Sequence, residues 1–258
     1  MTTARATTLG RIGFAVLSLG VWSLFSATTG RDVLPSPLVT AQTLAGGFRD
    51  GWLLDATLVT LSETIPAFLL AAIVGLIAGG ALGIARYWGD VFEPLILGTY
   101  AIPKVTLYPI FLILFKVGAA SKIAFGFFHG VFPIQILTQS ATANIKPTYL
   151  KVARSLRLSS RQTLQFVVLP AIVPMLVIGL RLAFSLTFIG VILGEMFASH
   201  AGLGFLLGAA DATFNIKRIL AVIVVLAAIG IGVNALFYWW ERRVGHARAD
   251  VAENALAL

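Results

Sequence analysis

The stretch YLKVARSLRLSSRQTLQFVVLP, residues 149–170, is a basic amphipathic segment set between long apolar segments. Its apolar side chains recur at i, i+3, i+4 and i+7, which predicts a short helix with one apolar stripe: Tyr149, Val152, Ala153 and Leu156. The cations of the segment fall on the other faces, so this helix is expected to lie near a membrane surface. An amphipathic helix kept between membrane spans is a candidate contact point for a partner.

A second helix is predicted to follow directly. Ser159 and Gln162 have the spacing of a capping box, and the helix is expected to run through Val168 before Pro170 opens the next span. The segment is therefore predicted to be a helix, a tight turn and a helix. The alternative is an ordinary basic loop that obeys the positive-inside rule.

Composition indicates a membrane protein. Hydrophobic residues make up 58% of the 258 residues, charged residues make up 12%, and the mean hydropathy is +0.93. A soluble domain of this size cannot bury so much apolar surface. Several segments approach or exceed the length of about 20 apolar residues that crosses a bilayer core. The chain is predicted to be an all-α, polytopic membrane protein with a single membrane domain over residues 1–258.

About six transmembrane helices are predicted: Ile12 to Thr28, Leu58 to Ala85, Phe92 to Phe115, Ala119 to Ser140, Ala171 to Ala198, and Ile219 to Trp240. With both termini cytoplasmic, eleven lysines and arginines fall in cytoplasmic segments and six in external ones, which supports that orientation. A signal peptide is the alternative for the first span, but a retained span is favoured because its apolar run exceeds an ordinary signal core. Residues 31–55 are expected to form an external loop.

The sequence offers little for catalysis or cofactor binding. The chain has no cysteine, and His129, His200 and His246 lie too far apart to form a recognisable ligand motif, so no metal site is predicted. None of the six lysines follows a glycine, so the phosphate-binding GxxxxGK[ST] loop is missing. The net charge of +8 is explained by cytoplasmic loops rather than by nucleic acid. We therefore expect neither catalytic residues nor a bound cofactor in this chain.

Residues 151–170 resemble the Glu-Ala-Ala loop of ABC importer permeases. In that family Glu-Ala-Ala is followed by three residues, Gly, nine residues, a hydrophobic residue, one residue and Leu-Pro. The corresponding positions are Lys151-Val152-Ala153, Arg157, Val167 and Leu169-Pro170. This sequence departs from the pattern by Lys for Glu, Val for Ala and Arg for Gly. An arginine in the left-handed turn that glycine adopts freely costs about 1 kcal/mol, so either the turn differs or neighbouring contacts hold it.

The phrases Ala153-Arg154-Ser155-Leu156, Gln162-Thr163-Leu164 and Val167-Val168-Leu169-Pro170 are similar to the nitrate, sulfonate and taurine branch of that family. The resemblance covers most of the chain beyond the first span. The further matching phrases are Leu34-Pro35-Ser36-Pro37, Ile102-Pro103-Lys104 with Pro109, Lys116-Val117-Gly118, Ser121-Lys122-Ile123, Gly179-Leu180-Arg181, Glu195-Met196-Phe197 and Gly202-Leu203-Gly204.

This resemblance implies a type I importer permease of the bacterial inner membrane. Such a permease pairs with itself, is powered by a separate ATPase that binds ATP and Mg²⁺, and receives its solute from an external binding protein. Coupling to the ATPase is then assigned to Lys151, Val152, Ala153, Leu156, Arg157, Leu158, Leu169 and Pro170. Part of the external docking surface is expected within residues 202–218.

Ionisable and helix-breaking residues are energetically unfavourable in a bilayer, so those inside the predicted spans are candidates for the translocation path: Pro103, Lys104, His129, Arg181 and Glu195. Lys104 lies in a span broken by prolines, where a path role and a local structural role are equally supported. Packing is favoured for His129, and a salt bridge or carbonyl cap for Arg181. Glycines spaced by four, Gly75, Gly79 and Gly83, suit close helix contact either within the chain or between two copies.

The predicted function is import of a small solute, and the branch indicates an organic or inorganic anion such as sulfonate, taurine or nitrate, although related permeases also carry neutral heterocycles. The alternative is an ion-coupled secondary transporter. It requires membrane carboxylates, for which Glu63 and Glu195 are the serious candidates. A membrane-embedded enzyme is a weaker rival, because no paired carboxylates or nucleophile–base spacing emerges.

Overall fold

The structure is a computed structural model that describes residues 2–30 and 33–256. Arg31, counted above among the external cations, lies outside these ranges. Every regular element within them is helical: α1 (Thr2–Thr29), α2 (Pro37–Arg49), α3 (Trp52–Ile84), α4 (Arg86–Ala101), η1 (Lys104–Leu107), α5 (Tyr108–Phe115), α6 (Ala119–Ala143), α7 (Pro147–Ser155), α8 (Ser160–Thr163), η2 (Leu164–Val168), α9 (Leu169–Ala198), α10 (Leu203–Ala212) and α11 (Ile216–Leu256).

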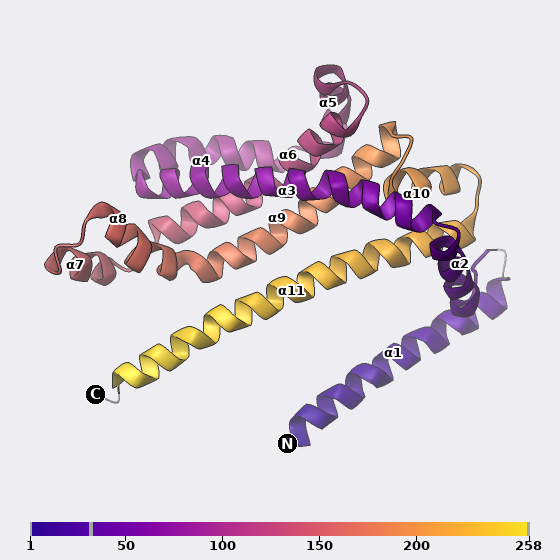
Figure 1. Ribbon diagram of the computed structural model, residues 1–258, viewed down its shortest axis with the longest axis horizontal. Coiled ribbons are helices and arrows are strands. Elements are labelled where there is room, and N and C mark those ends of the chain that lie inside the picture. Colours follow the sequence, from indigo (N-terminus) through magenta and orange to yellow (C-terminus); the bar gives the residue numbers. More distant parts are fainter. Residues whose placement is uncertain (1, 31–32, 257–258) are drawn as a thin grey trace.

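The long helices run roughly along one axis, so the molecule is elongated (Figure 1). α7 and α8 lie at one end of that axis, which we call the elbow end. α2 and α10 lie at the opposite end, which we call the cap end (Figure 1).

Four helical runs among the described residues are long and apolar enough to cross a membrane: Trp52–Ile84, Ala119–Ala143, Ser160–Ala198 and Ile216–Arg243. α4 and the run Lys104–Phe115 count as a fifth span if they are taken together. They meet at an angle of 87°, as in a broken span or a re-entrant loop, and we call the pair the broken span. The described apolar part of α1, Gly13–Thr29, is shorter than these spans. The all-α, multi-pass class is confirmed, while the predicted six spans become four straight spans, one broken span and one shorter apolar helix.

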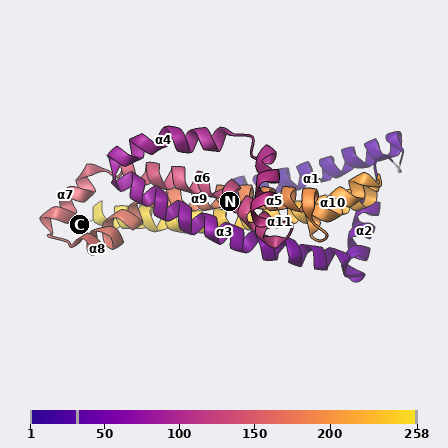
Figure 2. The ribbon, with the colours of Figure 1, turned by 90° about the horizontal axis from the view of Figure 1, so that it is seen from above.

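The break in the fifth span follows from its prolines. Pro103 disfavours helical backbone at the preceding residue, and Ile102 is extended, with φ −61° and ψ 135°. The chain then forms the 3₁₀ turn η1 before α5, in which Pro109 occupies the first turn and needs no N–H. α4 consequently lies along one side of the bundle, and the chain turns away from it toward α5 (Figure 2).

Residues 31–55, predicted to be an external loop, are largely helical where they are described. Ser36 caps α2 by accepting a hydrogen bond from the Val39 amide at 3.4 Å. Gly47 lies so close to α3 that a Cβ would come within 2.6 Å of the Leu53 side chain. Gly47 thus allows α2 to fold back against the start of α3.

The core consists of α3, α6 and α9, with α6 in contact with both neighbours. Gly75, Gly79 and Gly83 all face α6, and a Cβ on Gly79 would lie 2.4 Å from the Gln135 carbonyl oxygen. On the other side of α6, a Cβ on Gly130 would lie 2.0 Å from the hydroxyl of a threonine in α9. The glycine repeat therefore serves contact within the chain, which decides between the two uses predicted for it.

α10 and α11 complete the bundle. At the cap end, Leu53 and Ala56 of α3 pack with Leu203 of α10 and with Val222 and Val225 of α11. Along the middle of the molecule, α11 packs against α9 through a second buried cluster: Val177, Phe184, Phe188 and Phe237. The first of these clusters fixes α10 at the cap end of the bundle.

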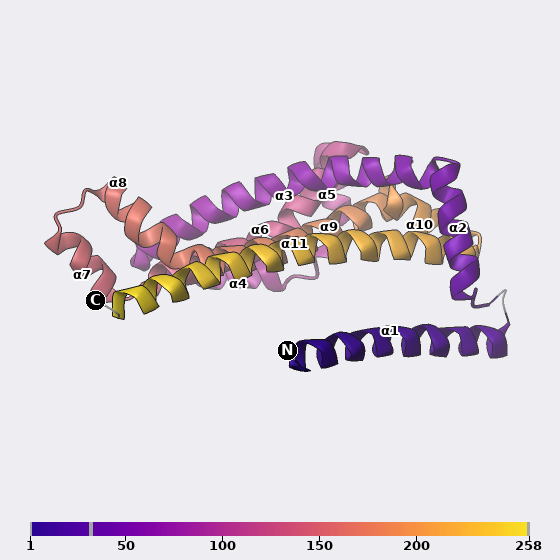
Figure 3. The ribbon, with the colours of Figure 1, turned by 60° about the horizontal axis from the view of Figure 1, so that its bottom comes forward.

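α1 stands apart from the bundle and joins it by way of α2 (Figure 3). Trp22 Nε1 donates a hydrogen bond to the Pro35 carbonyl oxygen at 3.1 Å, and Ser26 Oγ donates to the Leu34 carbonyl oxygen at 2.7 Å. Large apolar side chains along α1, such as Phe14, remain exposed. In a bilayer this surface is covered by lipid or by another protein.

Gly79→Ala is expected to lower the free energy of unfolding by about 1–3 kcal/mol, because the new Cβ forces α3 and α6 apart. Gly80→Ala is the matched control, since a Cβ there has nothing within 4 Å. Alanine at this uncrowded position is expected to be neutral or stabilising by up to about 1 kcal/mol. Thermal unfolding of the detergent-solubilised chain measures both variants, and equal midpoints would contradict the described packing.

Candidate functional site

The elbow, residues 147–168, comprises α7, α8 and η2 and lies at the elbow end of the molecule (Figure 1). α8 and η2 form the first residues of the long run Ser160–Ala198. It joins the last residues of α6 to the first residues of α9. Because α6 and α9 belong to the core, a displacement of the elbow acts on two core helices at once.

α7 ends in a tight turn at Arg157. The φ angle of Arg157 is +52°, in the left-handed region that glycine adopts most easily. The Arg157 amide donates to the Arg154 carbonyl oxygen, and the Leu158 amide donates to the Ala153 carbonyl oxygen, both at 3.0 Å. The left-handed turn is therefore present although the sequence has arginine, and backbone hydrogen bonds hold it.

The capping box at Ser159 is confirmed. The Gln162 amide donates to Ser159 Oγ at 3.3 Å, and the Ser159 amide donates to Gln162 Oε1 at 2.9 Å. These reciprocal bonds start a new helix directly after the turn.

The second helix runs through Val168 as predicted, but its second half is π-helical and it does not end before the span. α8 ends at Thr163, and η2 continues it as a π-helical segment into α9 without a gap. A proline inside a continuous helix clashes with the carbonyl four residues earlier, which for Pro170 is that of Phe166. The wider π turn over residues 164–168 relieves this clash. Leu169 and Pro170 therefore belong to the same helical run as the span.

The elbow exposes apolar side chains together with cations. Leu156 is 66% exposed and Val152 is 51% exposed, whereas Ala153 from the same stripe is buried. Lys151 and Arg157 are also exposed. An exposed apolar edge rimmed by charges, beyond the ends of the spans, has the character of a protein docking surface.

A groove of about 700 Å³ lies between the elbow and the ends of α3 and α6. Leu158, which is half-buried, lines it together with Leu150 and Leu164. Arg86 also lines it and donates to the Ala143 carbonyl oxygen at 2.6 Å. A hollow rather than packed side chains thus separates much of the elbow from the bundle.

The bend of the broken span presents Lys104. Its Nζ donates to the Tyr100 carbonyl oxygen at 3.2 Å and lies 4.2 Å from the centroid of the Tyr100 ring. The Phe132 ring centroid is 5.5 Å away. Lys104 is half-buried and the neighbouring Pro103 is exposed. An ammonium has three N–H donors, so Lys104 satisfies one carbonyl freed by the bend and keeps donors for a ligand.

Two other path candidates have protein partners. His129 is buried, its Nδ1 lies 3.0 Å from the Phe125 carbonyl oxygen, and its ring packs edge-on against that of Phe125. Arg181 of α9 pairs with Glu241 of α11 at 3.3 Å. The salt bridge favoured for Arg181 is confirmed, and this pair links two spans.

Glu195, the remaining candidate, belongs to a cluster that we call the polar clamp: Thr60, Glu63, Lys122 and Glu195, each at most 4% exposed. Lys122 Nζ lies 2.5 Å from Glu63 Oε1, and Thr60 Oγ1 donates to Glu195 Oε2 at 3.0 Å. The clamp joins α3, α6 and α9 near the cap end.

The polar clamp also holds the loop between α9 and α10. The Gly204 amide donates to Glu195 Oε2 at 2.7 Å, the Leu203 amide donates to Thr60 Oγ1 at 2.8 Å, and Lys122 Nζ donates to Ser199 Oγ at 2.9 Å. Gly202 has φ +104°, and a Cβ there would lie 2.3 Å from the Glu195 carboxyl group. The Gly-Leu-Gly phrase is thus needed for close approach of the loop.

Sequence reasoning did not predict the polar clamp. It treated Glu63 and Glu195 as separate candidates and regarded Lys122 as an external loop residue. A lysine, two glutamates and a threonine near the outer ends of three predicted spans were the available signal, but pairing them required the packing of α3, α6 and α9.

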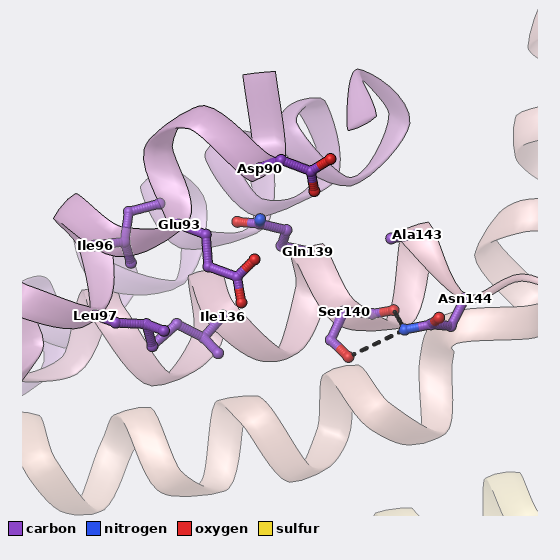
Figure 4. A pocket seen from close by; sticks show the side chains of 9 residues that line it. All are labelled: Asp90, Glu93, Ile96, Leu97, Ile136, Gln139, Ser140, Ala143 and Asn144. Carbon is purple, nitrogen blue, oxygen red and sulfur yellow. Dashed lines mark hydrogen bonds between the residues drawn. The ribbon is translucent and has the colours of Figure 1, made fainter. Parts of the chain in front are cut away.

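A smaller cavity of about 280 Å³ lies between α4 and α6 toward the elbow end (Figure 4). Asp90 and Glu93 of α4 line it, together with Gln139 and Ser140 of α6 and with Asn144, which directly follows α6. Asn144 Nδ2 donates to the Ser140 carbonyl oxygen at 2.9 Å (Figure 4). Two carboxyl groups make this cavity unfavourable for an anion.

Apolar spans around a glycine-packed core, one of them broken at a lysine, define a multi-pass membrane protein with the architecture of a transport subunit. The chain belongs to the family described as binding-protein-dependent transport system inner membrane component, whose sequence profile matches residues 34–246. It is accordingly a permease subunit of an ABC importer.

Individual relatives agree with this assignment. The chain is 29% identical over 240 residues to the nitrate import permease protein NrtB of Synechococcus elongatus, covering 88% of this chain and 86% of that protein. It is 30% identical over 245 residues to the bicarbonate transport system permease protein CmpB of the same species, covering 90% and 86%. An inward-facing structure of the MetNI methionine ABC transporter shares the fold, with a TM-score of 0.65 at 18% identity over 75% of this chain and 96% of that chain.

Arg157→Gly is expected to stabilise the turn by up to about 1 kcal/mol, because glycine removes the cost of the left-handed backbone. Arg157→Val is the opposing control, since a β-branched residue at positive φ raises that cost. Hydrogen exchange of the amides of residues 156–158 measures local opening. Slower exchange in the valine variant than in the glycine variant would contradict the strained turn.

Proposed function

We propose that this permease imports a small anion, of the size and charge of nitrate, bicarbonate or a short sulfonate. The observation that carries the proposal is Lys104, a half-exposed cation at the bend of the broken span. Relatives named for nitrate and bicarbonate transport support the same class of solute.

The position of Lys104 suits a step along the path. α4 has 16 residues and rises about 24 Å at 1.5 Å per residue, so the bend falls within a bilayer core of roughly 30 Å. Irregular backbone at such a depth is tolerated where it meets protein or a water-filled cavity. An ammonium with free donors at this place stabilises an anion that has left bulk water. Pro103 contributes by preventing a continuous helix across the bend.

The energy source in this proposal is a separate ATPase that binds ATP and Mg²⁺ and docks on the elbow. The exposed stripe of Val152 and Leu156 inserts into a groove of the ATPase, and Lys151 and Arg157 surround the contact. Closure of the nucleotide sites then tilts the elbow, which moves α6 and α9 as parts of a rigid core. The elbow and both termini are cytoplasmic in this arrangement, as the distribution of cations favours.

The assembly we propose contains two copies of this permease, two ATPase subunits and an external binding protein. The exposed apolar surface of α1 provides contact area for lipid or a second copy. The cap end, with α10 held by the polar clamp, provides the face for the binding protein.

An ion-coupled secondary transporter is the less supported alternative. Its coupling ion requires a carboxylate that reaches water, but Glu63 is 4% exposed and Glu195 is 0% exposed. Both glutamates instead have partners inside the polar clamp.

Leu156→Asp is expected to abolish co-purification of the ATPase and to reduce ATP-driven uptake at least about tenfold, because a charge replaces an apolar docking contact. The variant should still insert, since Leu156 is 66% exposed. Phe214→Asp is the control for ATPase co-purification alone, as Phe214 is 85% exposed in the loop after α10, on the face proposed for the binding protein. Undiminished ATPase binding by Leu156→Asp would defeat the proposed docking, and uptake without any ATPase would favour secondary transport.

Lys104→Gln is expected to raise the solute concentration for half-maximal uptake about 10- to 100-fold, the loss typical of a charge-assisted hydrogen bond. Lys104→Arg should retain most activity because it keeps the charge. Lys116→Gln, an equal charge change at an exposed position after α5, is the control. Uptake of nitrate or bicarbonate by proteoliposomes measures all three, and parallel behaviour of the two glutamine variants would remove Lys104 from the path.

A further inference from the structure

The polar clamp leaves two oxygen atoms unaccounted for. Glu63 Oε1 is paired with Lys122, and Glu195 Oε2 accepts hydrogen bonds from Thr60 Oγ1 and the Gly204 amide. Glu63 Oε2 and Glu195 Oε1 are buried and have no hydrogen-bond donor. Buried carboxyl oxygens without donors are rare because they forfeit their hydration.

The two glutamates are neighbours within the clamp. Glu63 lies one helical turn after Thr60, which binds Glu195, and Lys122 binds both Glu63 and Ser199, which lies one turn after Glu195. Two ionised carboxylates in contact repel, and with one ammonium they leave a net charge of −1 in an apolar interior. A single proton between the two free oxygens supplies the missing donor for one and satisfies the other. It also makes the cluster neutral.

The contacts of each carboxyl group decide which one carries the proton. Glu63 faces the Lys122 ammonium directly, which favours its ionised form. Glu195 receives a hydroxyl and an amide, both neutral donors, on its other oxygen. The remaining titratable group near the clamp is Tyr108, whose hydroxyl donates to the Gly194 carbonyl oxygen at 2.9 Å and is therefore occupied.

The space around Glu195 restricts what else could bind there. A Cβ on Gly202 would lie 2.3 Å from the Glu195 carboxyl carbon, and a Cβ on Gly204 would lie 2.7 Å from Glu195 Cβ. No room is left on that side for a hydrated cation.

We propose that the polar clamp is a proton site in which Glu195 is protonated on Oε1 and donates to Glu63 Oε2. The resulting chain runs from the Lys122 ammonium to the Glu63 carboxylate to the Glu195 carboxylic acid. It is neutral, and each of the four carboxyl oxygens either accepts or donates a hydrogen bond. This chain ties α3, α6, α9 and the loop before α10 into one outer block, so the face presented by α10 moves together with the core.

Glu195→Gln provides the decisive variant, because the glutamine amide reproduces the donor at Oε1 and the acceptor at Oε2. In the full-length chain in lipid bilayers, we expect a thermal midpoint close to that of the unsubstituted protein. Glu63→Gln removes the carboxylate that faces Lys122 and is expected to lower the midpoint by roughly 10 °C. Glu195→Ala, which removes both the donor and the acceptor, is expected to be destabilised to a similar extent.

Infrared spectroscopy tests the proton itself. At neutral pH the unsubstituted chain should show the carbonyl stretch of a protonated carboxylic acid, and Glu195→Gln should lack it. Absence of this band from the unsubstituted chain overturns the proposal even where a variant fails to fold. A clear rise in midpoint on Glu195→Gln would show instead that both carboxyl groups are ionised, and loss of the band in Glu63→Gln but not in Glu195→Gln would place the proton on Glu63.

Discussion

Backbone-to-backbone contact between α6 and its two neighbours is the constraint on which the other features depend. Gly79 of α3 and Gly130 of α6 leave no space for a side chain at their contacts, so the three core helices cannot slide past one another without a clash. Within a bilayer, where apolar burial gives helices little reason to associate, such close packing is what holds spans together. The core therefore behaves as a stiff element that extends from the elbow end to the cap end.

Both functional ends are attached to this element. The elbow connects α6 to α9, and the groove beside it leaves space for it to tilt. At the other end, the polar clamp joins the same helices to α3 and to the loop before α10. A push on the elbow is then transmitted to the cap end through packed helices, while the broken span beside the core carries the half-exposed lysine that we assign to the solute.

Local sequence signals predicted the features that depend on neighbours in the chain. Hydropathy predicted the membrane class, Pro103 predicted the break between α4 and α5, and Ser159 with Gln162 predicted the start of α8. Features that depend on distant residues were missed or incomplete. The helix α2 was missed within residues 31–55, because the role of Gly47, close contact with Leu53, appears only once α2 packs against α3. Glu63 and Glu195 could not be joined before α3 and α9 were packed. The π turn was missed because a proline clash has several local solutions.

The central claim, that the elbow receives force from an ATPase on the cytoplasmic side, can be tested at one position. The natural chain has no cysteine, so Leu156→Cys introduces a single thiol at the exposed edge of the elbow. In sealed vesicles of known orientation, we predict that this thiol reacts with a membrane-impermeant reagent from the cytoplasmic side and cross-links to the ATPase subunit when the two are co-expressed. Reaction from the external side, or intact ATP-driven uptake without any such cross-link, would contradict the account.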